Sequence, residues 1–264
     1  MKSFEVKRIH GGVLSPARQE LVSEETLTLI VNGRKLLAFQ CIPEMLEELA
    51  VGFLITEGLV ASPADVLKVE APRRVAPARH EVAVEANLPA ERLRQFQEAL
   101  VAGSSCGRAL SSGQGFDPLD CRRKIDMTFR VRNEVLLGAL AEFRRRSARS
   151  DRPPGTHASA IAQGMELPAF AEDVGRHNAV DKVVGACARR GIPLHDKILL
   201  TTGRVSLEVA AKALRAGLPL IASTRGPTAA AVELAQDAAI AVAGFASAGG
   251  MSVYSAAWRI ALDT

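Results

Sequence analysis

Aromatic side chains and long hydrophobic runs are scarce in this sequence. Phe, Trp and Tyr make up 4% of the 264 residues, against 48% for the hydrophobic class as a whole. We therefore expect an aliphatic core, and the chain is long enough to bury a large one. No run reaches the roughly eighteen apolar residues of a membrane-spanning helix, and residues 1–7 lack the apolar stretch of a secretory signal. These absences predict a cytoplasmic globular protein with no membrane partner.

Cysteine is also rare, and the common metal and nucleotide motifs are missing. The four cysteines, Cys41, Cys106, Cys121 and Cys187, have no regular spacing and form no Cys-x-x-Cys pair, which argues against a disulfide framework. His157 lacks the glutamate two residues later that zinc deaminases need. The Gly-x-Gly-x-x-Gly and P-loop patterns are absent too. We therefore expect no metal site, and we disfavour zinc hydrolases, dehydrogenases and NTPases.

The charge balance is mildly basic. The formal net charge is +4 and the pI is about 9.0, which suits an anionic ligand. Aromatic and basic residues do not interleave as they do in grooves that bind single-stranded nucleic acid. We therefore expect no nucleic-acid partner.

The first 102 residues alternate between strand and helix patterns. Residues 1–42 read as strands, and Asn32-Gly33 between two alternating runs, 26–31 and 35–42, predicts a hairpin. Three further elements are expected: a helix opening at Pro43 and ending near Gly58, a strand at 81–85, and a helix at 93–101.

The last third predicts parallel βα units. Apolar strands at 197–202, 218–223 and 240–245 alternate with helices at 205–216 and from about 228 to 238. Ligands of such sheets lie beyond the carboxyl ends of the strands. Arg204 and Arg225 fall in the turns at two of these ends, so we expect a site for an anionic group there. Ordinary βα turns are the alternative; they would explain the glycines, but they explain two arginines at equivalent turns less well.

An earlier helix is expected at 133–147, and it ends in a run of basic residues. Arg144, Arg145 and Arg146 complement the dipole at its carboxyl end. We read this run as a solvated helix end in preference to a nucleic-acid patch.

Residues 172–182 concentrate polar chemistry around one glycine. The segment reads Glu-Asp-Val-Gly-Arg-His-Asn-Ala-Val-Asp-Lys, and its second half has the apolar spacing of a helix start. On that helix His177 and Asp181 lie one turn apart and face the same way. We expect Arg176, His177 and Asn178 to face a ligand. The alternatives are a solvated turn before an amphipathic helix and, for His177, a cap or a core hydrogen-bond partner.

Cys106 is the candidate nucleophile. It lies in a Gly- and Ser-rich stretch with Arg108 two residues away, and an exposed thiol beside a cation is the setting in which cysteine reacts. Cys41 in a strand and Cys187 in a helix read as small core hydrophobes, and Cys121 is a weaker second candidate.

Several long segments together resemble the formate dehydrogenase accessory sulfurtransferases, the FdhD family. The resemblance runs over nearly the whole chain. The matching segments are residues 48–58, 104–107, 172–182, 202–204, 227–228, 244–245 and 253–254.

The resemblance implies a sulfur carrier. Cys106 would accept sulfur as a persulfide from a cysteine desulfurase and pass it to the molybdenum of bis-molybdopterin guanine dinucleotide before this cofactor enters formate dehydrogenase. GDP-like nucleotides would mimic the cofactor, and the protein would be a homodimer. The implied fold is mixed α/β, with a smaller β-rich N-terminal domain (1–102) and a cytidine-deaminase-like three-layer domain (103–264). The implied cofactor residues are Phe245, Ala246, Ser247, Ala248, Gly249 and Gly250, to which we add Arg176, His177, Asn178, Arg204 and Arg225.

The sequence departs from the family pattern at three places. The usual Cys-Gly-x-Cys ends here in Ala109, so a second thiol is missing. A Thr-Gly-Gly-x-His segment is Pro-Gly-Thr-His at 154–157, and Gly250 stands where a basic residue is common. A second hypothesis therefore remains open: a non-catalytic chaperone that binds the cofactor or guanine nucleotides without efficient sulfur transfer.

Overall fold

The computed structural model describes residues 2–102, 125–148, 155–247 and 249–262. Its largest element is a six-stranded mixed sheet in the order β10-β9-β11-β12-β13-β14. The strands are β9 (His157–Gln163), β10 (Glu166–Asp173), β11 (Ile198–Thr201), β12 (Leu220–Ser223), β13 (Ala241–Ser247) and β14 (Gly250–Ser255).

The three expected βα strands are confirmed. β11, β12 and β13 are parallel to one another, whereas β9 and β10 form an antiparallel hairpin whose strand β9 pairs antiparallel with β11. Sequence reasoning assigned no element to this hairpin. The start of β9 consequently lies beside the end of β11, which brings residues near 157 to the carboxyl edge of the parallel strands.

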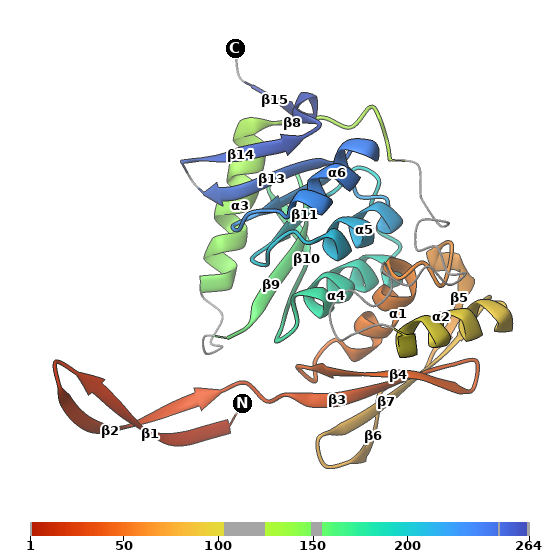
Figure 1. Ribbon diagram of the computed structural model, residues 1–264, viewed down its shortest axis with the longest axis vertical. Coiled ribbons are helices and arrows are strands. Elements are labelled where there is room, and N and C mark those ends of the chain that lie inside the picture. Colours follow the sequence, from red (N-terminus) through yellow and green to blue (C-terminus); the bar gives the residue numbers. More distant parts are fainter. Residues whose placement is uncertain (1, 103–124, 149–154, 248, 263–264) are drawn as a thin grey trace.

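Helices cover both faces of this sheet (Figure 1). The helix α3 (Asn133–Ala148) packs on one face, where Ile198, Leu200 and Ala222 join its core. The helices α4 (Arg176–Arg189), α5 (Leu207–Ala216) and α6 (Ala229–Asp237) cover the other face, where Leu199 and Ile221 belong to the larger core. Side chains that alternate along a strand therefore pack into the cores on opposite faces of the sheet. The expected three-layer α/β fold is confirmed.

The N-terminal part builds a five-stranded sheet with two helices. Its members are β3 (Glu25–Val31), β4 (Arg34–Cys41), β5 (Val66–Val69), β6 (Arg73–Ala76), β7 (Arg79–Ala86), α1 (Leu46–Thr56) and α2 (Ala90–Ala102). The predicted hairpin is confirmed: Asn32 and Gly33 both have positive φ, 48° and 77°, as a two-residue turn between twisted strands requires. The strand at 81–85 and the helix at 93–101 are confirmed within β7 and α2.

The first helix begins later than predicted. Pro43 does not open α1; Met45, at φ 55°, precedes its first residue, Leu46. The cause is the anchoring of Ile42, whose N–H donates to Asp173 Oδ2 (3.1 Å) and whose carbonyl accepts from Lys182 Nζ (3.0 Å). The chain must leave this fixed point before it can turn into the helix.

The helices α1 and α4 cross at very short range. A Cβ added to Gly52 would lie 1.8 Å from the carbonyl oxygen of Asp181, and one added to Gly185 would lie 1.9 Å from that of Glu48. Two glycines therefore permit backbone contact between the N-terminal part and the three-layer part. One apolar core includes Leu27, Leu54 and Val180 from both parts. The division into domains 1–102 and 103–264 stays a prediction.

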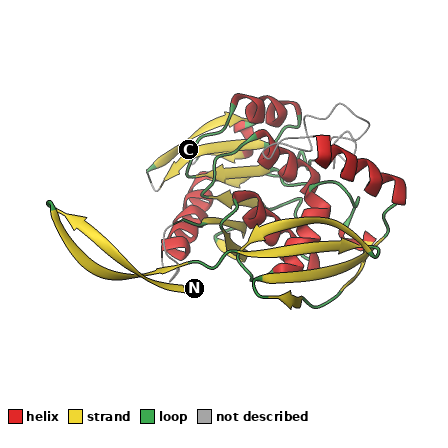
Figure 2. Cartoon of the chain, turned by 60° about the horizontal axis from the view of Figure 1, so that its bottom comes forward, coloured by secondary structure: helices red, strands yellow, loops and turns green. Residues whose placement is uncertain are grey.

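A separate hairpin forms an arm at the N-terminus. Strands β1 (Lys2–His10) and β2 (Val13–Leu21) pair with each other and with no other described strand, and they extend away from the body (Figure 1 and Figure 2). At the other end of the chain, β8 (Val131–Arg132) and β15 (Ile260–Ala261) form a short parallel pair. None of the helices in the described ranges is long and apolar enough to span a membrane.

Candidate functional site

Two matching turns form the centre of the candidate site. β11 ends in Thr201, whose Oγ1 accepts the N–H of Gly203 (3.1 Å), and β12 ends in Ser223, whose Oγ accepts the N–H of Arg225 (3.0 Å). A strand-ending hydroxyl that bonds the backbone two residues later is a standard turn device. The Ser223 hydroxyl also donates to the carbonyl of Gly203 (2.6 Å), which holds the two turns together.

Residues from β9 and α4 complete this edge of the sheet. Thr202 Oγ1 accepts the N–H of Ala158 (2.9 Å), which fixes the start of β9 and with it His157. Arg176 is the first residue of α4, and its stem packs on Gly203, where an added Cβ would lie 3.0 Å from Arg176 Cβ. Segments as far apart in sequence as Ala158 and Thr202 therefore meet at one edge.

These residues surround a basic cavity of about 490 Å³. No ion pair joins Arg176, Arg204 or Arg225 to a carboxylate in the described part of the chain, and the buried Nε of Arg176 has no hydrogen-bond partner there. Burial, together with the charges of Arg176, His177 and Arg225, holds the pKa of His157 below its usual value. The cavity is lined by Thr156, His157, Arg176, Thr202, Arg204, Thr224 and Arg225.

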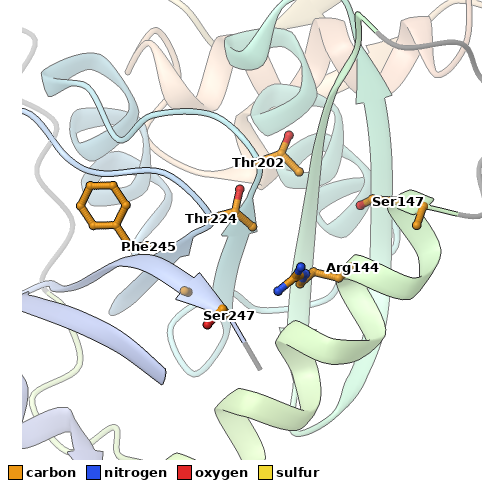
Figure 3. Close-up of a pocket in the computed structure, with 8 residues that line it drawn as sticks. Arg144, Ser147, Thr202, Thr224, Phe245 and Ser247 are labelled. Atoms are coloured by element: carbon orange, nitrogen blue, oxygen red, sulfur yellow. The ribbon is translucent and has the colours of Figure 1, made fainter. Parts of the chain in front are cut away.

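A second cavity, of about 610 Å³, adjoins the first. Figure 3 shows the residues that line this second cavity. Thr202 and Thr224 line both cavities and form the boundary between them. The other residues that line the second cavity come from the end of α3 and from β13: Arg144, Ser147, Ala148, Phe245, Ala246 and Ser247.

The implied cofactor segment falls partly on this second cavity. Phe245, Ala246 and Ser247 line it, whereas Gly249 precedes β14 and Gly250 is the first residue of that strand. Ser247 Oγ is within hydrogen-bond distance of both, 3.3 Å from the N–H of Gly249 and 3.3 Å from the carbonyl of Gly250. Ala248 is outside the described residues.

The three residues expected to face a ligand from the 172–182 segment lie in different surroundings. Arg176 lines the basic cavity. His177 Nε2 lies 3.0 Å from Glu208 Oε2 on α5, and this contact holds the pKa of the Glu208 carboxyl below its usual range. The Asn178 amide donates to Asp173 Oδ1 (2.9 Å) and to the carbonyl of Gln40 (2.8 Å).

Three other charged residues of that segment, Asp173, Asp181 and Lys182, are buried in ion pairs. Lys182 pairs with Asp173 (2.6 Å), and Asp181 accepts from Thr56 (2.6 Å) and from Lys212 (2.8 Å). Asp181 therefore contacts α1 and α5, and His177, one turn earlier, also contacts α5 through Glu208. The segment ties α4 to both parts of the molecule and so fixes the position of Arg176.

The two cysteines that the structure describes are buried. Burial raises the pKa of the Cys41 thiol to about 12 and that of Cys187 to about 11. A thiol with such a pKa is a poor nucleophile at neutral pH. Cys106, Ala109 and Cys121 lie outside the described residues. In the described part of the chain, no three His, Cys, Asp or Glu residues cluster as metal ligands would.

Sequence reasoning missed part of the site. It treated His157 only as a departure from a motif, read Arg144 as part of a solvated helix end, and assigned no role to Thr156, Thr202 or Thr224. Thr202 and Thr224 directly follow the last residue of β11 and of β12. Their position at the carboxyl edge of the sheet could therefore have indicated that they line the site. The arrangement as a whole offers a basic cavity for an anionic group beside a larger cavity with an aromatic ring.

Known proteins match this chain in sequence over nearly its whole length. A sequence model of the FdhD/NarQ family matches residues 22–261. The sulfur carrier protein FdhD of Shouchella clausii is 30% identical over 99% of this chain and 97% of that protein. Its counterpart in Bacillus subtilis is 28% identical over 97% and 96%.

A solved structure shares the fold. This crystal structure, of a protein assigned as a formate dehydrogenase accessory protein of Desulfotalea psychrophila, superposes with a TM-score of 0.73 and covers 98% of this chain and 99% of that one at 20% identity. On the family match and the identity to curated relatives, this chain belongs to the FdhD/NarQ family.

Proposed function

We propose that this protein is a sulfur carrier in the maturation of formate dehydrogenase, with Cys106 as the sulfur acceptor. Relatives matched over nearly the whole chain are named sulfur carrier proteins. The observation that carries the proposal is the basic cavity at the ends of β11 and β12, with three arginines free of carboxylate partners among the described residues. A protein that delivers sulfur to an anionic cofactor needs a site that binds the anionic groups of this cofactor.

The first chemical step is thiolate exchange. The Cys106 thiolate attacks the terminal sulfur of a persulfide on a cysteine desulfurase. The bond between the two desulfurase sulfurs breaks, and the desulfurase cysteine leaves as a thiolate. Cys106 then carries one sulfane sulfur, with no net oxidation.

The second step passes this sulfur to the substrate, the molybdenum of bis-molybdopterin guanine dinucleotide. Sulfane sulfur becomes sulfide only by taking up two electrons. Since Ala109 replaces the family's second cysteine, we propose that the reduced metal of the substrate supplies this electron pair and that Cys106 leaves as a thiolate. Pyrophosphate groups of the substrate suit the basic cavity, because arginine binds phosphate through two parallel hydrogen bonds.

Mass spectrometry of the intact protein tests the acceptor. Incubation with a cysteine desulfurase and cysteine should add the mass of one sulfur atom to the unaltered protein and to Cys121→Ala, and should add nothing to Cys106→Ala. Equal addition to Cys106→Ala would refute the assignment.

A second candidate function is a chaperone that binds the cofactor or guanine nucleotides without efficient sulfur transfer. The observation in its favour is Ala109, where the family has a thiol. It predicts GDP binding with no sulfur added to any cysteine. We also propose a cytoplasmic homodimer that acts with a cysteine desulfurase and formate dehydrogenase; light scattering during size-exclusion chromatography tests the dimer.

A further inference from the structure

The end of α3 carries three consecutive arginines in three different environments. Arg145 pairs with Glu142 one turn earlier. Arg146 lies over the ring of Phe170, 4.6 Å from its centroid. Arg144 has neither an ion pair nor a hydrogen bond with any residue in the described ranges. Its guanidinium extends from α3 into the 610 Å³ cavity (Figure 3). The helix dipole can be satisfied by Arg145 and Arg146, so it does not explain where Arg144 points.

Phe245 supplies an aromatic surface in the same cavity. The residue is 61% exposed although its ring is large and apolar. Its φ is 52°, a left-handed conformation that bulky residues rarely adopt. The ring packs against Gly226, where an added Cβ would lie 2.6 Å from ring atom Cζ. A strained backbone that holds an exposed ring in a cavity points to a bound partner.

The rest of this cavity supplies hydroxyls and little charge. Thr202, Thr224, Ser147 and Ser247 line it, and its volume lies within the range of about 300–1,000 Å³ that is typical of sites for organic ligands. An aromatic face, a guanidinium and hydroxyls suit a flat heteroaromatic ring with acceptor atoms on its edge. The adjoining basic cavity, with its three arginines, suits phosphate.

We propose that Arg144 selects the base of the bound nucleotide. The base stacks on Phe245, and the Arg144 guanidinium donates two hydrogen bonds to O6 and N7 of guanine while the phosphates lie in the basic cavity. Arginine carries only donors, so it pairs with the two acceptors of guanine and meets an amino group at the same place on adenine. This inference rests on the proposed function, which requires a nucleotide-bearing cofactor.

Calorimetric titration with GDP and with ADP tests the assignment. A good bidentate pair discriminates between bases by about ten- to a hundredfold, so the unaltered protein should bind GDP more tightly than ADP by that factor. Arg144→Ala should lose the preference through weaker GDP binding, with ADP affinity unchanged. Arg144→Lys keeps the positive charge but not the two parallel N–H donors of the guanidinium, so it should lose the preference for GDP as well. Arg145→Ala, the matched neighbour, should behave as the unaltered protein, and Arg204→Ala should weaken both nucleotides alike.

The outcomes separate this inference from the proposed function. A guanine preference that survives in Arg144→Ala would overturn the role of Arg144 alone. Equal weakening of GDP and ADP in Arg144→Ala, with rescue by Arg144→Lys, would make Arg144 a phosphate contact and would also overturn the inference. No saturable binding of either nucleotide to the unaltered protein would overturn both the inference and the cofactor site of the proposed function. Sulfur loading of Cys106 is measured without nucleotide and stays independent of all three.

Discussion

The crossing of α1 and α4 gives the sharpest prediction for stability. In Gly52→Ala the new methyl would lie 1.8 Å from the carbonyl oxygen of Asp181, far inside the 3.0 Å below which real Cβ contacts essentially never occur. Both groups are rigidly attached to helices, so α1 and α4 must separate by more than an ångström.

The cost of this separation has two parts. Overpacking of a core costs about 1–3 kcal/mol and occasionally more. Moving α1 also pulls Thr56 away from Asp181, now 2.6 Å apart, and strains the ion pair of Glu57, at the end of α1, with Lys212 on α5 (2.7 Å). Breaking a buried pair outright costs about 3–5 kcal/mol. We expect a loss of at least about 3 kcal/mol, which is a large share of the roughly 5–15 kcal/mol that stabilises a typical domain.

Urea unfolding followed by circular dichroism measures this loss. Gly138→Ala on α3 is the matched control, because its new methyl meets the Sδ atom of Met165 (2.6 Å), the far end of an exposed and flexible side chain. The control should be unchanged or slightly more stable, since alanine favours a helix interior over glycine. A Gly52→Ala protein that unfolds within about 1 kcal/mol of the unaltered one would refute the tight crossing.

Three further predictions concern the site and the thiols. Gly203→Ala places a methyl 3.0 Å from Arg176 Cβ; it should weaken GDP binding several-fold by calorimetry with the urea midpoint little changed, and unchanged affinity would count against a role for Arg176. The pKa of His157 is lowered in the folded protein. As pH falls below about 6.5, the unfolded chain therefore takes up the proton first, and the free energy of unfolding drops. A bound anion acts in the opposite direction, because it raises the pKa of His157. GDP binding should therefore tighten and take up protons as pH falls, measured in buffers of different ionisation enthalpy, and a His157→Gln protein with the same proton uptake would contradict this. With pKa values of about 12 and about 11, Cys41 and Cys187 should resist iodoacetamide at pH 8 until urea unfolds the chain; rapid labelling of either in the native protein would show that it is not buried as described.

The parallel strands and their turns could be predicted from the sequence because their signals lie close together in the chain. Each of β11 and β12 ends in a hydroxyl residue followed by a turn with glycine and arginine, so strand, turn and candidate anion ligand are encoded within a few residues. The expectation that Arg204 and Arg225 lie at equivalent turns is confirmed, and both line one cavity.

The β9–β10 hairpin escaped sequence reasoning because its signal is weak. β9 contains three alanines and β10 contains a proline, and neither residue favours a strand. What makes them strands is the pairing of β10 with β9 and of β9 with β11, about forty residues later in the sequence, together with burial under α3 and α4. The position of His157 beside Arg176 could not be predicted without that pairing.

The surroundings of the 172–182 segment depend on distant residues in the same way. Asn178 bonds to Gln40, Asp181 to Thr56, and His177 lies beside Glu208. A sequence pattern can show that these side chains share a helix, but not which of them face a cavity and which bind a buried partner. Of the three residues expected to face a ligand, Arg176 lines the cavity.

The central claim is that Cys106 carries sulfur and that the basic cavity presents the cofactor that receives it. The most direct test loads Cys106 with radioactive sulfur by a cysteine desulfurase, then adds bis-molybdopterin guanine dinucleotide in its reduced form and follows the label. The unaltered protein and an Arg204→Ala, Arg225→Ala double variant should load equally, because loading does not use the cavity. Only the unaltered protein should release its label to the cofactor at full rate. Equal release from both proteins would contradict the account.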